Sequence, residues 1–269
     1  MKAFVIAAGA LLLASNTLAA QTTVTPTSLN GWTLFDDAGP GTDPATITNA
    51  KPFNGNGSLQ YTVSASNQQP AARYLFAPVA LQGLNSLSLG YSFLTPLGTV
   101  PAASPTIRFL LTGISNGNQP GGRTDGSLGW YLNGSSDSWD TRSFSLTSGN
   151  FFFRLGGVGQ AANDCATTGS SFDDRRQTIA LFEAACNGVG GKINLNTASI
   201  YGVQVDWGTF VAPAAATSYA DMVNFTVGAN QGNFNFETTS VVPEPSSVAL
   251  LALGMAAVGF VARRRKQNS

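Results

Sequence analysis

Short stretches that alternate apolar and polar residues recur along the chain, and this pattern restricts the fold more than any other feature. Leu87, Leu89, Tyr91 and Phe93 alternate with serine and glycine, as expected for a strand that buries one face. Shorter candidate strands span Leu59–Ala65, Arg73–Phe76, Thr106–Thr112, Ser127–Leu132, Arg142–Leu146, Phe151–Leu155, Ile200–Trp207 and Asp221–Val227. Gly, Pro, Asn and Ser cluster between them, which favours turns. About ten short strands without alternating helices predict an all-β chain folded as an antiparallel β-sandwich.

One segment, Thr178–Glu183, fits two structures. Ile179, Phe182 and Cys186 form a thin helical stripe, whereas Thr-Ile-Ala-Leu-Phe also alternates acceptably as a strand. Two serines just upstream are each followed three residues later by an aspartate, which would make a reasonable capping box for a helix. The sequence leaves both structures open here.

The N-terminus has the layout of a secretory signal peptide over residues 1–20. Lys2 supplies a charge, Phe4–Leu13 is apolar, and Ala14–Ala20 is small and polar with a cleavage point near Gln21. The apolar run is too short to span a membrane well, and a small-residue cleavage site follows it. We therefore expect export of the chain and removal of this segment by signal peptidase.

The C-terminus, residues 242–269, has three parts in order. Pro243, Glu244 and Pro245 come first, and the two prolines keep this stretch extended. Residues 246–262 carry no charge, and as a helix they would reach roughly 25 Å, slightly short of a hydrocarbon core. A basic cluster follows, made up of Arg263, Arg264, Arg265 and Lys266. Because such a cluster can snorkel and stays cytoplasmic, the segment predicts a transmembrane helix that holds the body of the protein outside.

These three parts resemble the tail of PEP-CTERM proteins, which are exported bacterial proteins handled by a membrane-embedded exosortase. The matching residues are Val242–Pro245, the apolar run Val248–Ala262 and the basic cluster Arg263–Lys266. The resemblance implies a Gram-negative host, anchoring in the inner membrane before processing, and removal of the helix near the motif. It also implies delivery to the cell surface or the extracellular matrix. It implies nothing about the chemistry of the exported domain.

Removing both ends leaves residues 21–241, enough for one sandwich domain with a substantial core. Five of the 14 basic residues and one of the 14 acidic residues lie in the ends, so nine basic and 13 acidic residues remain, a net charge of −4. Nucleic-acid affinity comes chiefly from neutralised phosphates, so this domain makes a poor nucleic-acid binder. Charged residues are 10% of the chain, against about a quarter in typical domains. Neutral polar residues take their place.

Cys165 and Cys186 are the only two cysteines. In an exported chain such a pair predicts a disulfide, which should stabilise the fold by about 3 kcal/mol in the chain-entropy model. Two free buried thiols are the alternative. A metal site is disfavoured, because the chain has no histidine and no further thiolate to complete a ligand set.

A second resemblance lies between Ser199 and Gly228. The strand Tyr201–Gly208 is followed, after a loop, by Tyr-Ala-Asp-Met-Val-Asn-Phe at Tyr219–Phe225. This order is similar to the closing strands of jelly-roll carbohydrate-binding and laminin-G-like modules. It implies a jelly-roll-like sandwich and says less about a ligand.

No catalytic set emerges from the residues. The lack of histidine excludes nucleophilic triads that use it. A glycosidase needs two carboxylates that face each other across a cleft, and nothing in the spacing of the acidic residues pairs any two. We therefore expect a protein that is not an enzyme. A polysaccharide-active hydrolase with an unrecognised carboxylate pair is the alternative.

Three aromatic residues, Trp130, Tyr131 and Trp139, flank the turn formed by residues 133–136. Flat rings beside amide and carboxylate groups can stack on sugars, so these three are candidate carbohydrate-binding residues. The alternative places Trp130 and Trp139 in the core. The resulting hypothesis is an exported, non-enzymatic protein that associates with exopolysaccharide or another cell-surface polymer.

No cofactor is required by any motif. Asp36, Asp37 and Asp221 could supply oxygen ligands for a structural calcium ion. Turn and cap roles are favoured for these aspartates, because no recognised calcium-loop spacing is present.

Overall fold

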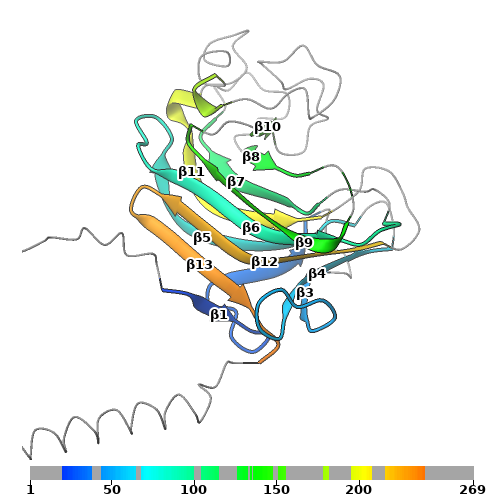
Figure 1. The fold of residues 1–269 in the computed structure, drawn as a ribbon. Coiled ribbons are helices and arrows are strands. Elements are labelled where there is room, and N and C mark those ends of the chain that lie inside the picture. Colours follow the sequence, from blue (N-terminus) through cyan, green and yellow to red (C-terminus); the bar gives the residue numbers. More distant parts are fainter. Residues whose placement is uncertain are drawn as a thin grey trace, which may run out of the picture.

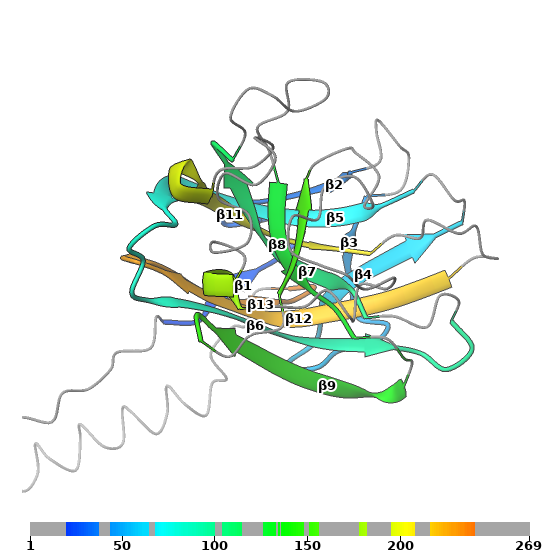
Figure 2. The ribbon, with the colours of Figure 1, turned by 90° about the horizontal axis from the view of Figure 1, so that it is seen from above.

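The computed structural model describes residues 20–37, 44–64, 68–99, 104–114, 126–132, 134, 136–147, 151–155, 178–181, 195–207 and 216–239. These residues form two β-sheets that pack face to face (Figures 1 and 2). The seven-stranded sheet contains β1 (Thr22–Val24), β3 (Thr46–Thr48), β4 (Ser58–Val63), β6 (Leu87–Thr95), β9 (Ser136–Ser145), β12 (Ala216–Val227) and β13 (Asn230–Phe236). The six-stranded sheet contains β2 (Trp32–Asp36), β5 (Pro70–Ala80), β7 (Thr106–Thr112), β8 (Gly126–Trp130), β10 (Phe152–Leu155) and β11 (Ser199–Asp206). The all-β sandwich predicted from the sequence is thus confirmed.

The strand order is that of a jelly roll. In one sheet β12 lies between β4 and β6, and β6 also pairs with β9. In the other sheet the order is β5-β11-β7-β8. In these two four-stranded halves, every neighbouring pair except β7 and β8 joins strands that are not consecutive in the chain, as in two interlocked Greek keys. All these pairs are antiparallel, and among the described strands only β1 pairs in parallel, with β13.

Each stretch that alternates in the sequence contributes a strand, but four strands were not predicted. These are β1, β2, β3 and β13, of which two have only three residues. The segment Thr178–Glu183, left open by the sequence, is helical at residues 179–181. The Thr178 hydroxyl accepts a hydrogen bond from the Leu181 N–H at 3.2 Å, and this is the contact of a helix N-cap.

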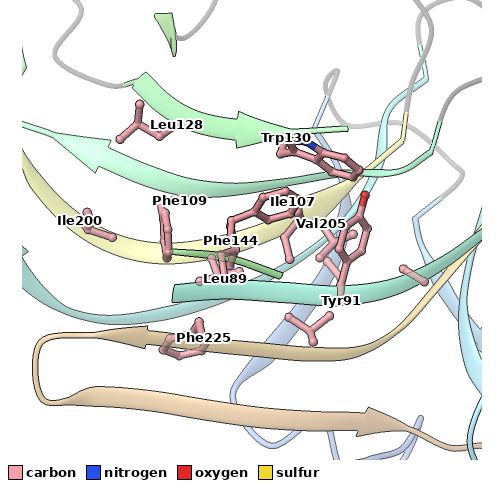
Figure 3. Close-up of a cluster of buried hydrophobic side chains, with 14 of the residues drawn as sticks. Leu89, Tyr91, Ile107, Phe109, Leu128, Trp130, Phe144, Ile200, Val205 and Phe225 are labelled. Carbon is pink, nitrogen blue, oxygen red and sulfur yellow. The ribbon is translucent and has the colours of Figure 1, made fainter. Parts of the chain in front are cut away.

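The core lies between the two sheets and is rich in aromatic rings (Figure 3). Leu89 and Tyr91 of β6 face Ile107 and Phe109 of β7, and all four side chains are fully buried. The Tyr91 hydroxyl donates a hydrogen bond to the Pro105 carbonyl at 2.6 Å, so this buried polar group is satisfied. Every second residue of these strands therefore points outward, which sets up the two outer faces of the sandwich.

The two sorting segments lie outside the described residues, apart from Ala20 at the end of the signal peptide. The signal peptide over residues 1–20 and the transmembrane helix over residues 246–262 thus stay predictions. Among the residues that the structure describes, no helix is both long and apolar enough to cross a membrane.

Candidate functional site

Strand alternation separates the three aromatic residues that the sequence grouped together. Trp130 ends β8, with its ring in the core, and Tyr131 is the next residue, so it faces the opposite side. Trp139 lies on β9, which belongs to the other sheet. A platform built from all three rings is therefore wrong, because the chain passes from one sheet to the other between them.

Trp130 is a core residue, which corrects its assignment as a candidate sugar-binding residue. Its side chain is 5% exposed, and its ring centroid lies 4.6 Å from that of Phe144 and 6.0 Å from that of Phe93. Phe93 and Phe144 belong to the seven-stranded sheet, so Trp130 bridges the two sheets (Figure 3). The ring serves packing between the layers.

Tyr131 lies beside the six-stranded sheet, on the side away from the core. Its ring is half-buried and meets the Phe152 ring edge-on, with 5.7 Å between centroids. Phe152 in turn covers Gly129, where a Cβ would lie 2.7 Å from the Phe152 ring. This pair seals the end of β8 and does not contact Trp139.

Trp139 forms a ring pair with Phe53, a residue that sequence reasoning missed. The two centroids are 5.1 Å apart and the planes are inclined by 47°. Phe53 is 41% exposed and Trp139 is half-buried, whereas Trp32, Trp130 and Trp207 are all buried. An aromatic residue in the Gly- and Asn-rich segment 49–57 was the available signal for Phe53, since turn segments rarely need such a ring.

The ring pair borders a surface of uncharged polar side chains, which we call the polar face. It is the outer side of β9, β6, β12 and β13, where register brings together Thr141 with Ser92, Ser143 with Gly90 and Asn224, and Ser145 with Ser88 and Thr226. Asn224 also lies opposite Asn233, and Thr226 opposite Gln231. None of these residues is charged. Hydroxyl and amide groups of this kind can both donate to and accept from sugar hydroxyls.

Phe53 begins a short loop, Phe53–Gly57, which we call the platform loop. Its backbone lies against two buried carboxyl groups. The Asn56 N–H donates to Glu237 Oε2 at 2.5 Å, and the Asn54 N–H lies 3.5 Å from Asp221 Oδ2. Asp221 also accepts hydrogen bonds from the backbone N–H groups of Met222 and Phe236. Asp221 and Glu237 are both fully buried. Burial raises the pKa of Asp221 to about 7, and the charge of Glu237 adds to this effect against the three backbone donors.

A second polar cluster lies on the outer side of the six-stranded sheet. Arg108 of β7 forms an ion pair with Asp206 of β11, and both side chains are buried. Gln204 and Gln69 each donate a side-chain hydrogen bond to Asp206, at 3.1 and 2.9 Å. Burial alone would lower the pKa of Arg108, but the Asp206 carboxylate raises it overall. The polar groups of this cluster bind one another, which favours a structural role over ligand binding.

The aspartates considered as calcium ligands do not lie together. Asp36 is on β2 of the six-stranded sheet and Asp221 is on β12 of the other sheet. The Asp36 carboxylate accepts the Gln69 N–H at 2.9 Å, and Asp37 accepts the Gln204 amide at 3.0 Å. Within the described part of the chain, no three acidic, His or Cys side chains gather as a metal site would require. Cys165 and Cys186 lie outside that part, so the disulfide stays a prediction.

Comparison with known proteins identifies the C-terminal segment. Residues 241–266 match the PEP-CTERM protein-sorting motif, so the resemblance noted for the tail is confirmed. The motif marks an exported bacterial protein that an exosortase processes after membrane anchoring. No curated protein matches the chain in sequence.

Several solved structures are similar to this chain at low identity. The family 11 carbohydrate-binding module of the cellulosomal cellulase Lic26A-Cel5E of Clostridium thermocellum is 13% identical, covers 74% of this chain and 88% of its own, and has a TM-score of 0.38. A carbohydrate-binding module specific for non-crystalline cellulose is 10% identical over 72% of this chain and 86% of its own, with a TM-score of 0.32. A protein of unknown function from Shewanella oneidensis MR-1 is 16% identical over 81% and 84%, with a TM-score of 0.35. The jelly-roll assignment rests on the strand order of this chain itself.

Proposed function

We propose that the exported domain binds a neutral polysaccharide of the cell surface or extracellular matrix, and that it has no enzymatic activity. The observation that carries the proposal is the ring pair of the exposed Phe53 and the half-buried Trp139 at the border of the polar face. Aromatic faces stack on the apolar sides of sugar rings, while neighbouring hydroxyl and amide groups fix their orientation.

Charge favours a neutral polymer over an acidic one. The domain between the sorting segments carries 13 acidic and nine basic residues, so an acidic polysaccharide meets net repulsion at low ionic strength. The polar face itself offers no positive side chain to offset this. The sequence left the charge of the polymer open, and the uncharged side chains of this face support a neutral polymer.

The alternative of a polysaccharide hydrolase lacks a supporting observation in the described residues. A glycosidase needs two carboxyl groups that reach the substrate. Asp221 and Glu237 are brought together, but both are fully buried and accept hydrogen bonds from the chain. Asp140, which is exposed near Trp139, is paired with Arg142 at 2.7 Å.

Trp139→Ala tests the proposal directly. We expect affinity for the host's own exopolysaccharide to fall roughly thirtyfold, as for the loss of an aromatic anchor worth about 2 kcal/mol. The free energy of unfolding should change by about 1 kcal/mol, because only one half-exposed ring contact is lost. Affinity electrophoresis in that polysaccharide, with hydroxyethyl cellulose as a neutral probe and alginate as an acidic one, measures binding, and thermal melting measures stability.

Two matched variants complete this experiment. Tyr131→Ala removes a half-buried ring from the other sheet and should leave binding unchanged. Trp130→Ala removes a core ring and should cost about 3–5 kcal/mol of stability. Wild-type affinity in Trp139→Ala, or a melting loss as large as that of Trp130→Ala, would end the sugar-platform proposal.

Processing at both ends gives a further prediction. Protein recovered from the extracellular fraction of its native host should lack Met1–Leu18 and the cluster Arg263–Lys266, because signal peptidase and an exosortase remove them. Intact-mass spectrometry measures both ends at once. Full-length chains in extracellular material would contradict this route.

A further inference from the structure

We infer that Asp221 and Glu237 are positioning residues: they hold the platform loop over the sheet so that the Phe53 ring lies against Trp139. The inference rests on the proposed function, since the ring pair is its binding element. It assigns the two buried carboxyl groups a role that no motif in the sequence shows.

The hydrogen bonds place the loop from both sides of Gly55. Asp221 faces the N–H of Asn54, the residue after Phe53, and Glu237 accepts the N–H of Asn56. The Asn56 side chain reaches further, donating to the Thr239 hydroxyl at 2.9 Å and accepting the Thr238 N–H at 3.1 Å. The loop is thus tied to β12 and to the segment that follows β13. Among the described residues the Phe53 ring pairs with Trp139 alone, so its position depends on these hydrogen bonds.

The loop can approach Glu237 only because it contains glycine. A Cβ on Gly55 would lie 1.8 Å from Glu237 Oε1, and Gly55 has a φ of +96° that other residues rarely adopt. A Cβ on Gly57 would lie 2.6 Å from the Glu237 Cα atom. Gly55 and Gly57 therefore let the loop backbone lie directly against Glu237, where a side chain at either position would collide with it.

A β-bulge turns Asp221 toward the loop. The pairing of β12 with β6 shifts register between Asp221 and Asn224, and Met222 within this bulge has a φ of +51°. A methionine in this region stores about 1–3 kcal/mol of backbone strain, and such strain persists where the surroundings enforce it. The bulge carries Asp221 under the platform loop and directs Met222 toward Asn54, whose side-chain amide lies 3.7 Å from the Met222 sulfur.

In the part of the chain that the structure describes, the lack of a cationic partner for Asp221 and Glu237 also supports their role in positioning the loop. The ion pairs found in the described residues are Arg108–Asp206 and Arg142–Asp140, so neither Asp221 nor Glu237 has a cationic partner there. Two adjacent buried carboxyl groups without such a partner are unfavourable compared with apolar side chains of similar size. What they provide in return is a set of acceptors for loop N–H groups that apolar side chains would leave unpaired.

Tryptophan fluorescence of the full chain in detergent tests the inference without any ligand. Of the four tryptophans, only Trp139 is not buried, so acrylamide quenching measured against a Trp139→Phe background reports on that ring. Glu237→Ala should release the loop, so quenching of Trp139 rises and its emission shifts to longer wavelength. Glu237→Gln keeps an acceptor for the Asn56 N–H and should restore both signals toward wild type.

Two further variants guard against a general loss of folding. Gly55→Ala leaves both carboxyl groups in the chain, but its Cβ would meet Glu237 Oε1, so it should displace the loop and expose Trp139 as Glu237→Ala does. Asp206→Asn disturbs a buried carboxylate that does not contact the loop, so it should lower the melting temperature and leave the quenching of Trp139 unchanged. Binding of the host exopolysaccharide should weaken roughly tenfold in Glu237→Ala and Gly55→Ala, and not in Asp206→Asn.

The outcomes separate the two proposals. Wild-type quenching in both Glu237→Ala and Gly55→Ala overturns the positioning role, whatever happens to binding. Released Trp139 in these variants, together with a wild-type protein that binds none of the tested polysaccharides, supports the positioning role and removes the proposed function. Increased quenching in Asp206→Asn would show that any destabilisation frees the ring, and this too would overturn the inference.

Discussion

Replacing Asp206 by alanine should lower the free energy of unfolding by about 3–5 kcal/mol, because it leaves a buried guanidinium group without its counter-charge. Arg108 is 7% exposed and donates from Nε to Asp206 Oδ2 at 2.5 Å. Gln204 and Gln69 lose the same acceptor. Urea denaturation of wild type and variant measures the difference.

The chain offers a matched control in its exposed ion pair. Arg142 and Asp140 lie 2.7 Å apart, with side chains 49% and 37% exposed. Solvent screens such a pair, so Asp140→Ala should change stability by less than about 1 kcal/mol. Replacing both buried partners by apolar residues, as in Arg108→Met with Asp206→Leu, should recover much of the loss. If Asp206→Ala and Asp140→Ala lower the free energy of unfolding equally, the buried ion pair of Arg108 and Asp206 contributes no more stability than the exposed one.

Alternation identified most of the sandwich because it acts within a single strand. The apolar residues of β6, Leu87, Leu89, Tyr91 and Phe93, all lie in the core as the sequence predicts. Strand β13 escaped notice because its inward residues, Phe234 and Phe236, alternate only over the end of a run of Asn, Gln and Gly. Its hairpin is set by Gly228, with a φ of +58°, and by pairing with β12. The three-residue strands β1 and β3 depend wholly on neighbours that are distant in the chain.

The site was harder to predict, because it joins segments far apart in sequence. Trp139 was one of the sequence candidates and stays one, but its grouping with Trp130 and Tyr131 treated closeness in sequence as closeness in space. The partner ring, Phe53, lies on a loop whose place is set by Asp221 and Glu237. A pair of carboxyl groups with no shared spacing gives no sequence signal. The sorting motif, by contrast, is contiguous, and the sequence alone identified it.

The stability of the protein should fall as the pH rises from about 4 to about 7, through the titration of Asp221. Its pKa is raised from 3.8 to about 7 in the folded protein. Over this window the folded protein keeps the proton that the unfolded chain has released, so rising pH favours unfolding. The contribution is complete below the unfolded pKa and is lost as the pH rises through the folded pKa. Its upper limit is about 4 kcal/mol, from 1.36 kcal/mol for each unit.

Asp221→Asn should remove most of this slope, because asparagine carries no proton to release. Its Oδ1 atom can still accept the Met222 and Phe236 N–H groups that Asp221 Oδ1 accepts at 2.7 and 3.0 Å. Glu237 is the charged group that raises the pKa of Asp221 further, so Glu237→Gln should shift the window to lower pH. Denaturation across pH 4 to 8 in the presence of EDTA measures the slopes without divalent cations. Repeating the series in calcium tests the ion considered for Asp221: if calcium binds there, it should stabilise wild type near pH 7 and leave Asp221→Asn unchanged.

One outcome would contradict the predicted pH dependence. If the stability of wild type in EDTA changes as little with pH as that of Asp221→Asn, Asp221 is ionised in the folded protein, and the backbone donors around it offset its burial.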